Sequence, residues 1–201
     1  MSNLQSKAQA TRAHIIRQAA AVFNQQGYAG TSMADIMAAT GLQKGGLYNH
    51  FKSKDELALA AFDYSAQLVQ EHYRQALQGK RHAGDRLAAV VNAFCDLMAE
   101  PPVRGGCPIL NTAIDSDDGH PELRQRAKAA MNAWRGMLRK IVVLGIGHGQ
   151  IDASASPDAV TTVVIATLEG GLMQTQLYGS PVHLDHARQH LLQYLQGLRA
   201  S

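Results

Sequence analysis

Apolar residues recur every three or four positions along most of this chain of 201 residues. Within residues 8–26, for example, Ile15, Ala19 and Phe23 would share one face of a helix. No segment alternates apolar and polar residues as a half-buried strand does, and aromatic residues make up only 5% of the chain. Apolar residues reach 46%, which is enough for a sizeable core. The pattern therefore predicts an all-α fold.

Glycine, proline and capping residues divide this pattern into about nine helices. Gly27 and Gly41 are placed to end helices, and Ser53 with Glu56 forms a capping box at the start of another. Pro121 suits the first turn of a long helix. The expected helices cover about residues 8–26, 31–41, 43–50, 53–78, 85–100, 108–114, 121–145, 157–179 and 185–198.

Composition argues against several classes of protein. The chain has no uninterrupted apolar run of about 18 residues, so it predicts no membrane span. The residues up to Lys7 contain no apolar segment, and we therefore expect no secretory signal. Two cysteines, Cys95 and Cys107, are too few for a disulfide framework. These features together predict a cytoplasmic protein.

The formal net charge of +3 is concentrated near the N-terminus. Residues 1–60 contain six basic and three acidic side chains, whereas the other 141 residues contain thirteen of each sign. The six basic residues are Lys7, Arg12, Arg17, Lys44, Lys52 and Lys54. A local excess of positive charge favours a polyanionic partner such as nucleic acid.

Residues 31–54 contain the most specific pattern in the chain. Two short helices are expected to meet across residues 39–41, and Leu47 and Phe51 are spaced to anchor the second of them. A helix this short is not stable alone, so the longer helices on either side must hold it. This is the arrangement of a helix-turn-helix, whose second helix enters the major groove of DNA.

Three groups of residues in this segment carry a family resemblance. They are Thr31 with Asp35-Ile36, then Gly41-Leu42, and then the run Lys44-Gly-Gly-Leu-Tyr-Asn-His-Phe51 followed by Lys52-Ser-Lys-Asp-Glu-Leu57. By these residues the chain resembles the TetR family of transcriptional repressors over about residues 10–58. The resemblance implies a DNA-binding domain at residues 1–58 and a helical effector-binding and dimerisation domain at residues 59–201.

The resemblance also places individual residues at the DNA. Gln43 and Asn49 can read base edges through paired hydrogen bonds, and Lys44 can reach guanine or a phosphate. Gly45 has no side chain to hold the helix away from the groove, while Tyr48 has core packing as its alternative role. The expected DNA contacts are Thr31, Gln43, Lys44, Gly45, Tyr48, Asn49, His50 and Lys54, of which Thr31, Tyr48, His50 and Lys54 suit phosphates.

The last two expected helices, at about 157–179 and 185–198, are candidates for joining two copies of the chain, as the resemblance also implies. Small residues between Thr167 and Gly171 would let helices cross closely. The final helix carries a repeat close to a heptad seam, formed by Leu184, Ala187, Leu191, Leu195 and Leu198. An ordinary core within one chain is the alternative explanation of this repeat.

A small-molecule effector is expected to bind among the helices between residues 85 and 180. Methionine and tryptophan form adaptable apolar walls, although plain core packing is the competing role for each residue. The expected lining residues are Phe94, Met98, Cys107, Leu110, Met131, Trp134, Met137, Leu138, Thr167 and Met173. The chain shows no motif for a metal ion or an organic cofactor.

Cys107 lies in the turn Gly105-Gly-Cys-Pro108, at the start of an expected helix. The helix dipole and the neighbouring Arg104 would favour the thiolate form of a cysteine there. Some TetR-like repressors carry a cysteine in a similar turn, so Cys107 is a candidate sensor of oxidants or electrophiles. Its alternative role is that of a small buried apolar residue, and Cys95 is expected to be core.

Together these features predict a homodimeric DNA-binding regulator without enzymatic activity. The most specific hypothesis is a repressor that a small-molecule or thiol-reactive effector releases from a near-palindromic operator. One alternative is a helical enzyme or carrier that uses Cys107 and an apolar pocket without DNA, and another is a structural helical adaptor. Salt-dependent binding to DNA distinguishes the first hypothesis from both alternatives.

Overall fold

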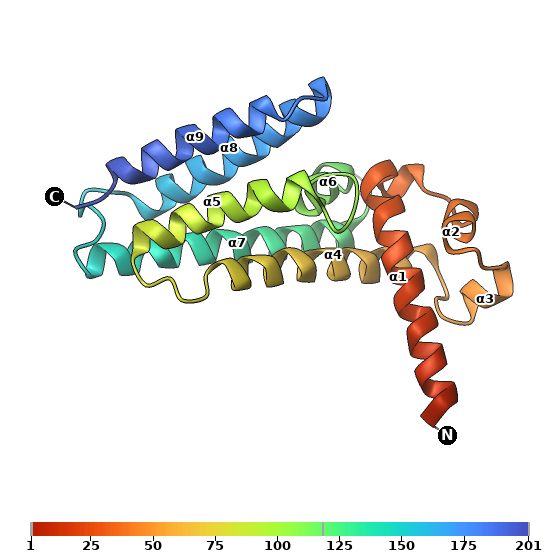
Figure 1. The fold of residues 1–201 in the computed structure, drawn as a ribbon. Coiled ribbons are helices and arrows are strands. Elements are labelled where there is room, and N and C mark those ends of the chain that lie inside the picture. The colour runs from red at the N-terminus through yellow and green to blue at the C-terminus, as the bar shows by residue number, and fades with distance from the viewer. Residues whose placement is uncertain (1, 118, 201) are drawn as a thin grey trace. The chain divides into compact units, whose positions relative to one another are not determined.

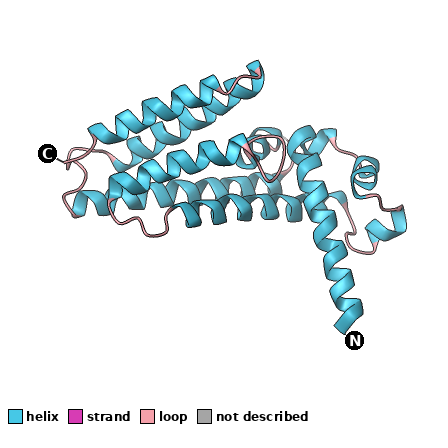
Figure 2. Cartoon of the chain, viewed as in Figure 1, coloured by secondary structure: helices cyan, strands magenta, loops and turns pink. Residues whose placement is uncertain are grey.

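The computed structural model describes residues 2–117 and 119–200, and the secondary structure of this part of the chain is helical (Figure 1). The predicted all-α fold is confirmed, and in the described residues the only β-type pairing is an isolated antiparallel bridge between Ile151 and Arg199 (Figure 2). None of the helices in the described ranges is long and apolar enough to cross a membrane. The helices are α1 (Ser2–Gly30), α2 (Met33–Thr40), α3 (Lys44–Tyr48), α4 (Lys54–Ala76), α5 (Ala83–Ala99), α6 (Pro108–Asp115), α7 (Pro121–Gly147), α8 (Pro157–Tyr178) and α9 (Val182–Gly197).

Two compact units divide the chain. We call the unit formed by residues 1–68 and 102–129 the head unit, and the unit formed by residues 69–101 and 130–201 the body unit. Helices α4 and α7 each begin in the head unit and end in the body unit. The unit that holds the helix-turn-helix is therefore larger than the 58 residues expected for the DNA-binding domain, because α6 and the start of α7 also belong to it.

Helix α1 is interrupted where a glycine stop was predicted. Gly27 has φ 74°, and the Thr31 hydroxyl donates a hydrogen bond of 2.7 Å to the Gly27 carbonyl. Ser32 then caps α2 through a reciprocal capping box with Asp35, and Gly41 ends α2 at φ 69°. Glycine adopts these left-handed angles without a steric penalty, so these residues set the two bends around α2.

The beginning of α1 lies earlier than predicted. The helix starts at Ser2, whereas the apolar pattern indicated a start near residue 8. The first seven residues are mostly polar, so a helical stretch there leaves no apolar periodicity in the sequence. Apolar periodicity indicates which residues are buried, so it does not reveal a helical extension made of polar residues.

The core of the head unit joins the helix-turn-helix to its supports. Buried side chains come from α1, α2, α3, α4, the turn between α3 and α4, and the segment before α6. They are Ile15, Ala19, Ala20, Ile36, Leu47, Phe51, Leu57, Ala61 and Val103. The long helices thus supply the apolar surface that α3, with its five residues, lacks.

In the body unit, α8 and α9 lie side by side, and α5 packs against both (Figure 1). The leucine repeat of α9 belongs to the core of this unit, since Leu184, Leu191 and Leu195 are buried within the single chain. Their predicted role as a seam between two chains is therefore wrong. A Cβ on Gly171 would lie 2.7 Å from the Cβ of Ala187, so the close crossing that small residues indicated is the crossing of α8 and α9 in one chain.

Candidate nucleic-acid interface

Helix α3 has one side in the core and the other in solvent. Leu47 and Phe51 are fully buried, as predicted, and fix the helix to the head unit. The exposed residues are Gln43, Lys44, Gly45, Tyr48 and Asn49. They present two amides, an ammonium group and a phenol, which are the groups that contact base edges and phosphates.

Tyr48 belongs to the exposed side of α3. Its side chain is 40% exposed, and the Lys44 ammonium lies 5.9 Å from the centre of its ring. The alternative in which Tyr48 packs in the core is therefore wrong. A phenol hydroxyl beside a positive charge is well suited to donate a hydrogen bond to a phosphate.

The glycines of α3 are not required by packing within the protein. A Cβ on Gly45 would meet no atom within 4 Å, and one on Gly46 would make only an ordinary contact of 3.8 Å with Leu42. Glycine inside a helix costs about 0.5–1 kcal/mol relative to alanine. Two consecutive glycines in α3 are therefore best explained by the close approach of something outside the chain.

The residues expected to contact phosphates do not all reach the surface. Thr31 is 2% exposed and its hydroxyl is already bonded to Gly27, so its side chain supports the start of α2 instead. His50 is half-buried, and the Lys54 ammonium lies 4.1 Å from the centre of the Tyr28 ring. Thr31 is therefore the buried one among the residues expected to contact phosphates.

Arg12 brings a positive charge from α1 to the helix-turn-helix. Its guanidinium lies 4.7 Å from the centre of the Phe51 ring, and its side chain is exposed. Arg12 is not among the expected DNA contacts, and 39 positions separate it from Phe51 in the sequence. Its signals in the sequence are the local excess of basic residues and its place near the start of the first helix.

A cluster around Tyr28 ties α1 to the starts of α4 and α7. The Tyr28 hydroxyl donates a hydrogen bond to the Asp55 carboxylate, and its ring meets His120 edge-on with centres 4.6 Å apart. Partial burial and the neighbouring Asp55 carboxylate raise the pKa of Tyr28 to about 12. Because Lys54 stacks on the same ring, this cluster also fixes the position of a basic side chain near the motif.

The residues expected to line an effector pocket are divided between the two units. Cys107 and Leu110 lie in the head unit, and the others lie in the body unit. Trp134 is buried and stacks with Tyr73 and Phe94, at 5.8 and 5.6 Å between ring centres. The indole N–H of Trp134 has no hydrogen-bond partner among the described residues. The remaining members are the half-buried Met98, Met131, Met137 and Thr167, the buried Leu138 and the exposed Met173.

Both cysteines are buried. Cys95 lies on the inner side of α5, as expected, and burial raises the pKa of its thiol to about 11. Cys107 is the N-cap residue of α6 and follows the Gly105-Gly106 turn, which lies against α1. A Cβ on Gly105 would lie 2.6 Å from the carbonyl oxygen of Asn24, so the turn that carries Cys107 requires glycine.

A helix-turn-helix held by long helices and joined to a helical body unit defines a class of protein, the DNA-binding transcriptional regulators. Two family models match the chain. Bacterial regulatory proteins, tetR family, matches residues 15–61, and Tetracyclin repressor-like, C-terminal domain, matches residues 83–191. The chain therefore belongs to the TetR family of transcriptional regulators and is not an enzyme.

Individual members of this family are similar to the chain over nearly its whole length. A TetR transcriptional regulator from Chloroflexus aurantiacus J-10-FL has 46% identity and a TM-score of 0.93, over 98% of this chain and 100% of that one. A regulator from Cytophaga hutchinsonii has 30% identity and a TM-score of 0.86, over 97% of this chain and 98% of that one. The HTH-type transcriptional repressor DhaR of Mycobacterium sp. (strain GP1) is 23% identical over 189 residues, or 87% of this chain and 86% of DhaR.

Proposed function

We propose that this regulator is a cytoplasmic repressor, which binds a near-palindromic operator as a homodimer and leaves it when an effector binds. The observation that carries the proposal is α3, whose exposed side combines Lys44 and Tyr48 with glycines that the protein's own packing does not need. Repression, as opposed to activation, is supported by the similarity to DhaR, which is named a repressor.

Individual roles in operator binding follow from the exposed groups. Gln43 and Asn49 read base edges, since a side-chain amide can form paired hydrogen bonds with adenine. Lys44 and Tyr48 contact guanine or the phosphates beside the groove, and His50 and Lys54 add to the phosphate contacts. Arg12 extends this basic surface along α1, and Thr31 acts indirectly, through its hydroxyl bond to the Gly27 carbonyl just before α2.

The dimer interface is proposed to lie on the exposed side of α8. Val163, Ala166, Gly170, Met173 and Leu177 follow one another at alternating steps of three and four residues, as the a and d positions of a coiled coil do. Leu177 is 70% exposed and Met173 is 53% exposed in the single chain. An apolar stripe of this kind marks a protein interface. Met173 is thus better explained as an interface residue than as part of a pocket.

Two routes of release are proposed, one in each unit. In the body unit, an effector with a hydrogen-bond acceptor would satisfy the buried indole N–H of Trp134 and pack against Phe94. In the head unit, an electrophilic alkene would add to Cys107: the sulfur bonds to one alkene carbon, the carbon–carbon π bond breaks, and the thiol proton ends on the other carbon. The enlarged side chain would displace the turn at Gly105. Either effector acts only if it binds the DNA-free state more tightly than the operator-bound state.

Fluorescence anisotropy with DNA that flanks the protein's own gene tests the proposed operator binding. The logarithm of the affinity should fall linearly with the logarithm of the salt concentration, and Lys44→Ala should reduce this slope by about 0.9 if Lys44 contacts one phosphate. Lys140→Ala, which removes an exposed lysine of the body unit, is the matched control and should change neither slope nor affinity. Binding without salt dependence, or an equal loss in both variants, contradicts the proposal.

A further inference from the structure

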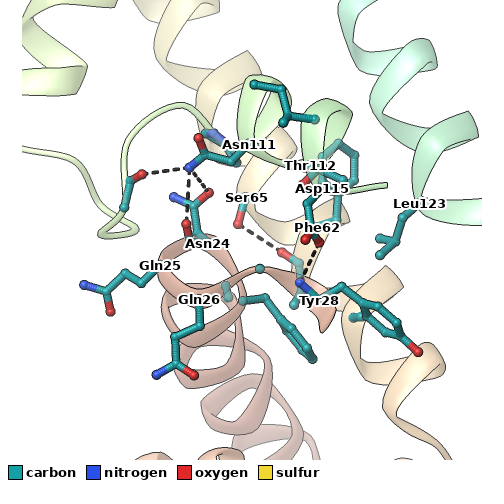
Figure 3. A pocket seen from close by; sticks show the side chains of 18 residues that line it. Asn24, Gln25, Gln26, Tyr28, Phe62, Ser65, Asn111, Thr112, Asp115 and Leu123 are labelled. Carbon is teal, nitrogen blue, oxygen red and sulfur yellow. Dashed lines mark hydrogen bonds between the residues drawn. The ribbon is translucent and has the colours of Figure 1, made fainter. Parts of the chain in front are cut away.

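A cavity of about 420 Å³ opens within the head unit, among α1, α4, α6 and the first turn of α7 (Figure 3). Its floor is buried and apolar, and its mouth is exposed and largely polar. The floor includes Ala20, Ala58, Ala61, Phe62 and Leu123, and the mouth includes Gln25, Gln26, Ile114 and Asp115. None of the residues expected to line an effector pocket lies in this cavity. Its volume falls in the range of small-molecule sites.

One wall of the cavity is built from side-chain amides whose hydrogen bonds are already made. The Asn24 amide donates to the Gly106 carbonyl at 3.0 Å. The Asn111 amide donates to the Asn24 side-chain oxygen at 3.0 Å (Figure 3). Asn111 also donates to the Gly105 carbonyl at 2.7 Å. These bonds hold α6 against α1, so the cavity is preformed and a ligand need not order its wall.

The opposite end of α6 places a carboxylate at the mouth. The Asp115 carboxylate accepts a hydrogen bond of 2.6 Å from the Tyr28 backbone N–H, and its other oxygen lies 2.7 Å from the position that a Cβ on Gly27 would occupy. A carboxylate has about four lone-pair positions, so one backbone hydrogen bond leaves capacity for another donor. Asp115 is therefore fixed in place and still able to bind a ligand group.

Charge decides which ligand group suits this mouth. Among the residues that line the cavity, Asp115 is the one with a charged side chain. Lys54 lies over the ring of Tyr28, whose hydroxyl is bonded to the Asp55 carboxylate. Arg126 on α7 is ion-paired with Asp63 on α4. The lining residues thus combine an apolar floor with a single negative charge, which complements a ligand that has an apolar body and a cationic end.

We propose that this cavity is a binding site for a small amphipathic cation. The apolar body lies against Phe62 and Leu123, and the ammonium group donates hydrogen bonds to the Asp115 carboxylate. The site is separate from the effector site proposed in the body unit, and binding to it does not depend on repression or on DNA.

Calorimetry on the full DNA-free protein with three matched probes tests this site. Phenylbutylamine, phenylbutanol and phenylbutyrate share one apolar body and differ in charge at one end. The amine should bind about fivefold more tightly than the alcohol, as for an ion pair near the surface, and the anion should bind more weakly than the alcohol. Equal affinities for the three probes, or no binding of any of them, would overturn the proposal.

Two carboxylate variants assign the charge preference to Asp115. Asp115→Asn keeps an oxygen that can accept the Tyr28 N–H, and it should remove the advantage of the amine over the alcohol. Asp117→Asn, which neutralises an exposed carboxylate outside the cavity, is the control and should retain that advantage. If Asp115→Asn binds the amine as well as the unmodified protein does, the proposed contact is wrong.

The location of the site is tested by amide chemical shifts. Phenylbutylamine should shift the amide signals of Gly27 and Gly105, which line the cavity, and leave that of Gly171 in the body unit unchanged. Thr112→Phe should fill the cavity and weaken binding of the amine and the alcohol alike, while a shift at Gly171 alone would overturn the location. Operator binding is measured in a separate experiment, so neither result bears on the proposed repression.

Discussion

Two helix pairs, α1 with α6 in the head unit and α8 with α9 in the body unit, are joined by different kinds of contact. In the head unit, α1 and α6 are joined by directed hydrogen bonds, such as those between Asn111 and Asn24. In the body unit, α8 and α9 meet through apolar packing, with Gly171 against Ala187. A directed bond is lost with a single side chain, whereas apolar packing weakens in proportion to the volume removed. The contact between α1 and α6 therefore depends on a few individual residues, and the contact between α8 and α9 depends on apolar volume.

The largest expected effect is on the apolar packing of the body unit. Leu191 on α9 is fully buried, so Leu191→Ala should lower the free energy of unfolding by about 2–5 kcal/mol. Urea denaturation measures this change, and His190→Ala, at the exposed neighbouring position, should cost less than about 0.5 kcal/mol. If Leu191→Ala keeps its stability but no longer dimerises, the leucine repeat lies in the interface between two chains after all.

The next effect concerns the apolar stripe that α8 exposes. Met173→Glu should raise the dimer dissociation constant by about ten- to a hundredfold, because it places a carboxylate in the proposed interface. Sedimentation velocity over a range of concentrations measures the constant. Gln70→Glu adds the same charge at an exposed position of α4 and should leave it unchanged. Equal effects of the two variants would place the dimer interface elsewhere.

The head unit should show the opposite behaviour, in which stability and function separate. Gly45→Ala should raise the free energy of unfolding by about 0.5–1 kcal/mol, since no neighbouring atom obstructs a Cβ there. The same change should weaken operator binding by about 1–3 kcal/mol, because the added methyl group lies on the side of α3 that we propose to face DNA. Denaturation and anisotropy measure the two quantities.

Gly136→Ala on α7 is the matched control for this prediction. Gly136 is also an exposed helical glycine with no atom within 4 Å of an added Cβ, so it should give the same gain in stability. It lies in the body unit, and operator affinity should therefore remain that of the unmodified protein. If Gly45→Ala also leaves the affinity unchanged, the glycines of α3 do not face DNA.

The smallest effect concerns the Tyr28 cluster at high pH. The pKa of Tyr28 is raised from 10.0 to about 12, so the unfolded chain loses this proton before the folded protein does. Stability from this group is complete below pH 10 and is lost as the pH rises to about 12. The urea midpoint should therefore decline less between pH 10 and about 12 in Tyr28→Phe than in the unmodified protein. Identical declines in the two proteins would show that the cluster does not raise the pKa of Tyr28.

The sequence predicted the local signals of this fold well. Gly41 and Pro121 stand at the helix ends for which they were predicted, because these signals act on residues only a few positions away. Leu47 and Phe51 were also identified as anchors of α3, since the spacing of apolar residues indicates which side is buried. The DNA contacts themselves stay a prediction.

Two features of the molecule could not be predicted from the sequence. Asn111 bonds with Asn24, and Asp115 with Tyr28, across 87 positions in each case, so no local pattern reveals the wall and mouth of the cavity. The leucine repeat of α9 has the same spacing whether its partner is another chain or its own α5 and α8. Only the buried state of Leu191 decides between the two, and burial is a property of the folded chain.

The division of the head unit into residues 1–68 and 102–129 has a consequence for synthesis on the ribosome. The helix-turn-helix emerges first, but Val103 in its core and the bonds from Asn111 to α1 emerge later. At about 5–20 residues per second, the 61 residues from 69 to 129 take about 3–12 seconds to make. During that interval the nascent chain carries its helix-turn-helix without Val103 in the core and without the hydrogen bonds from α6 to α1.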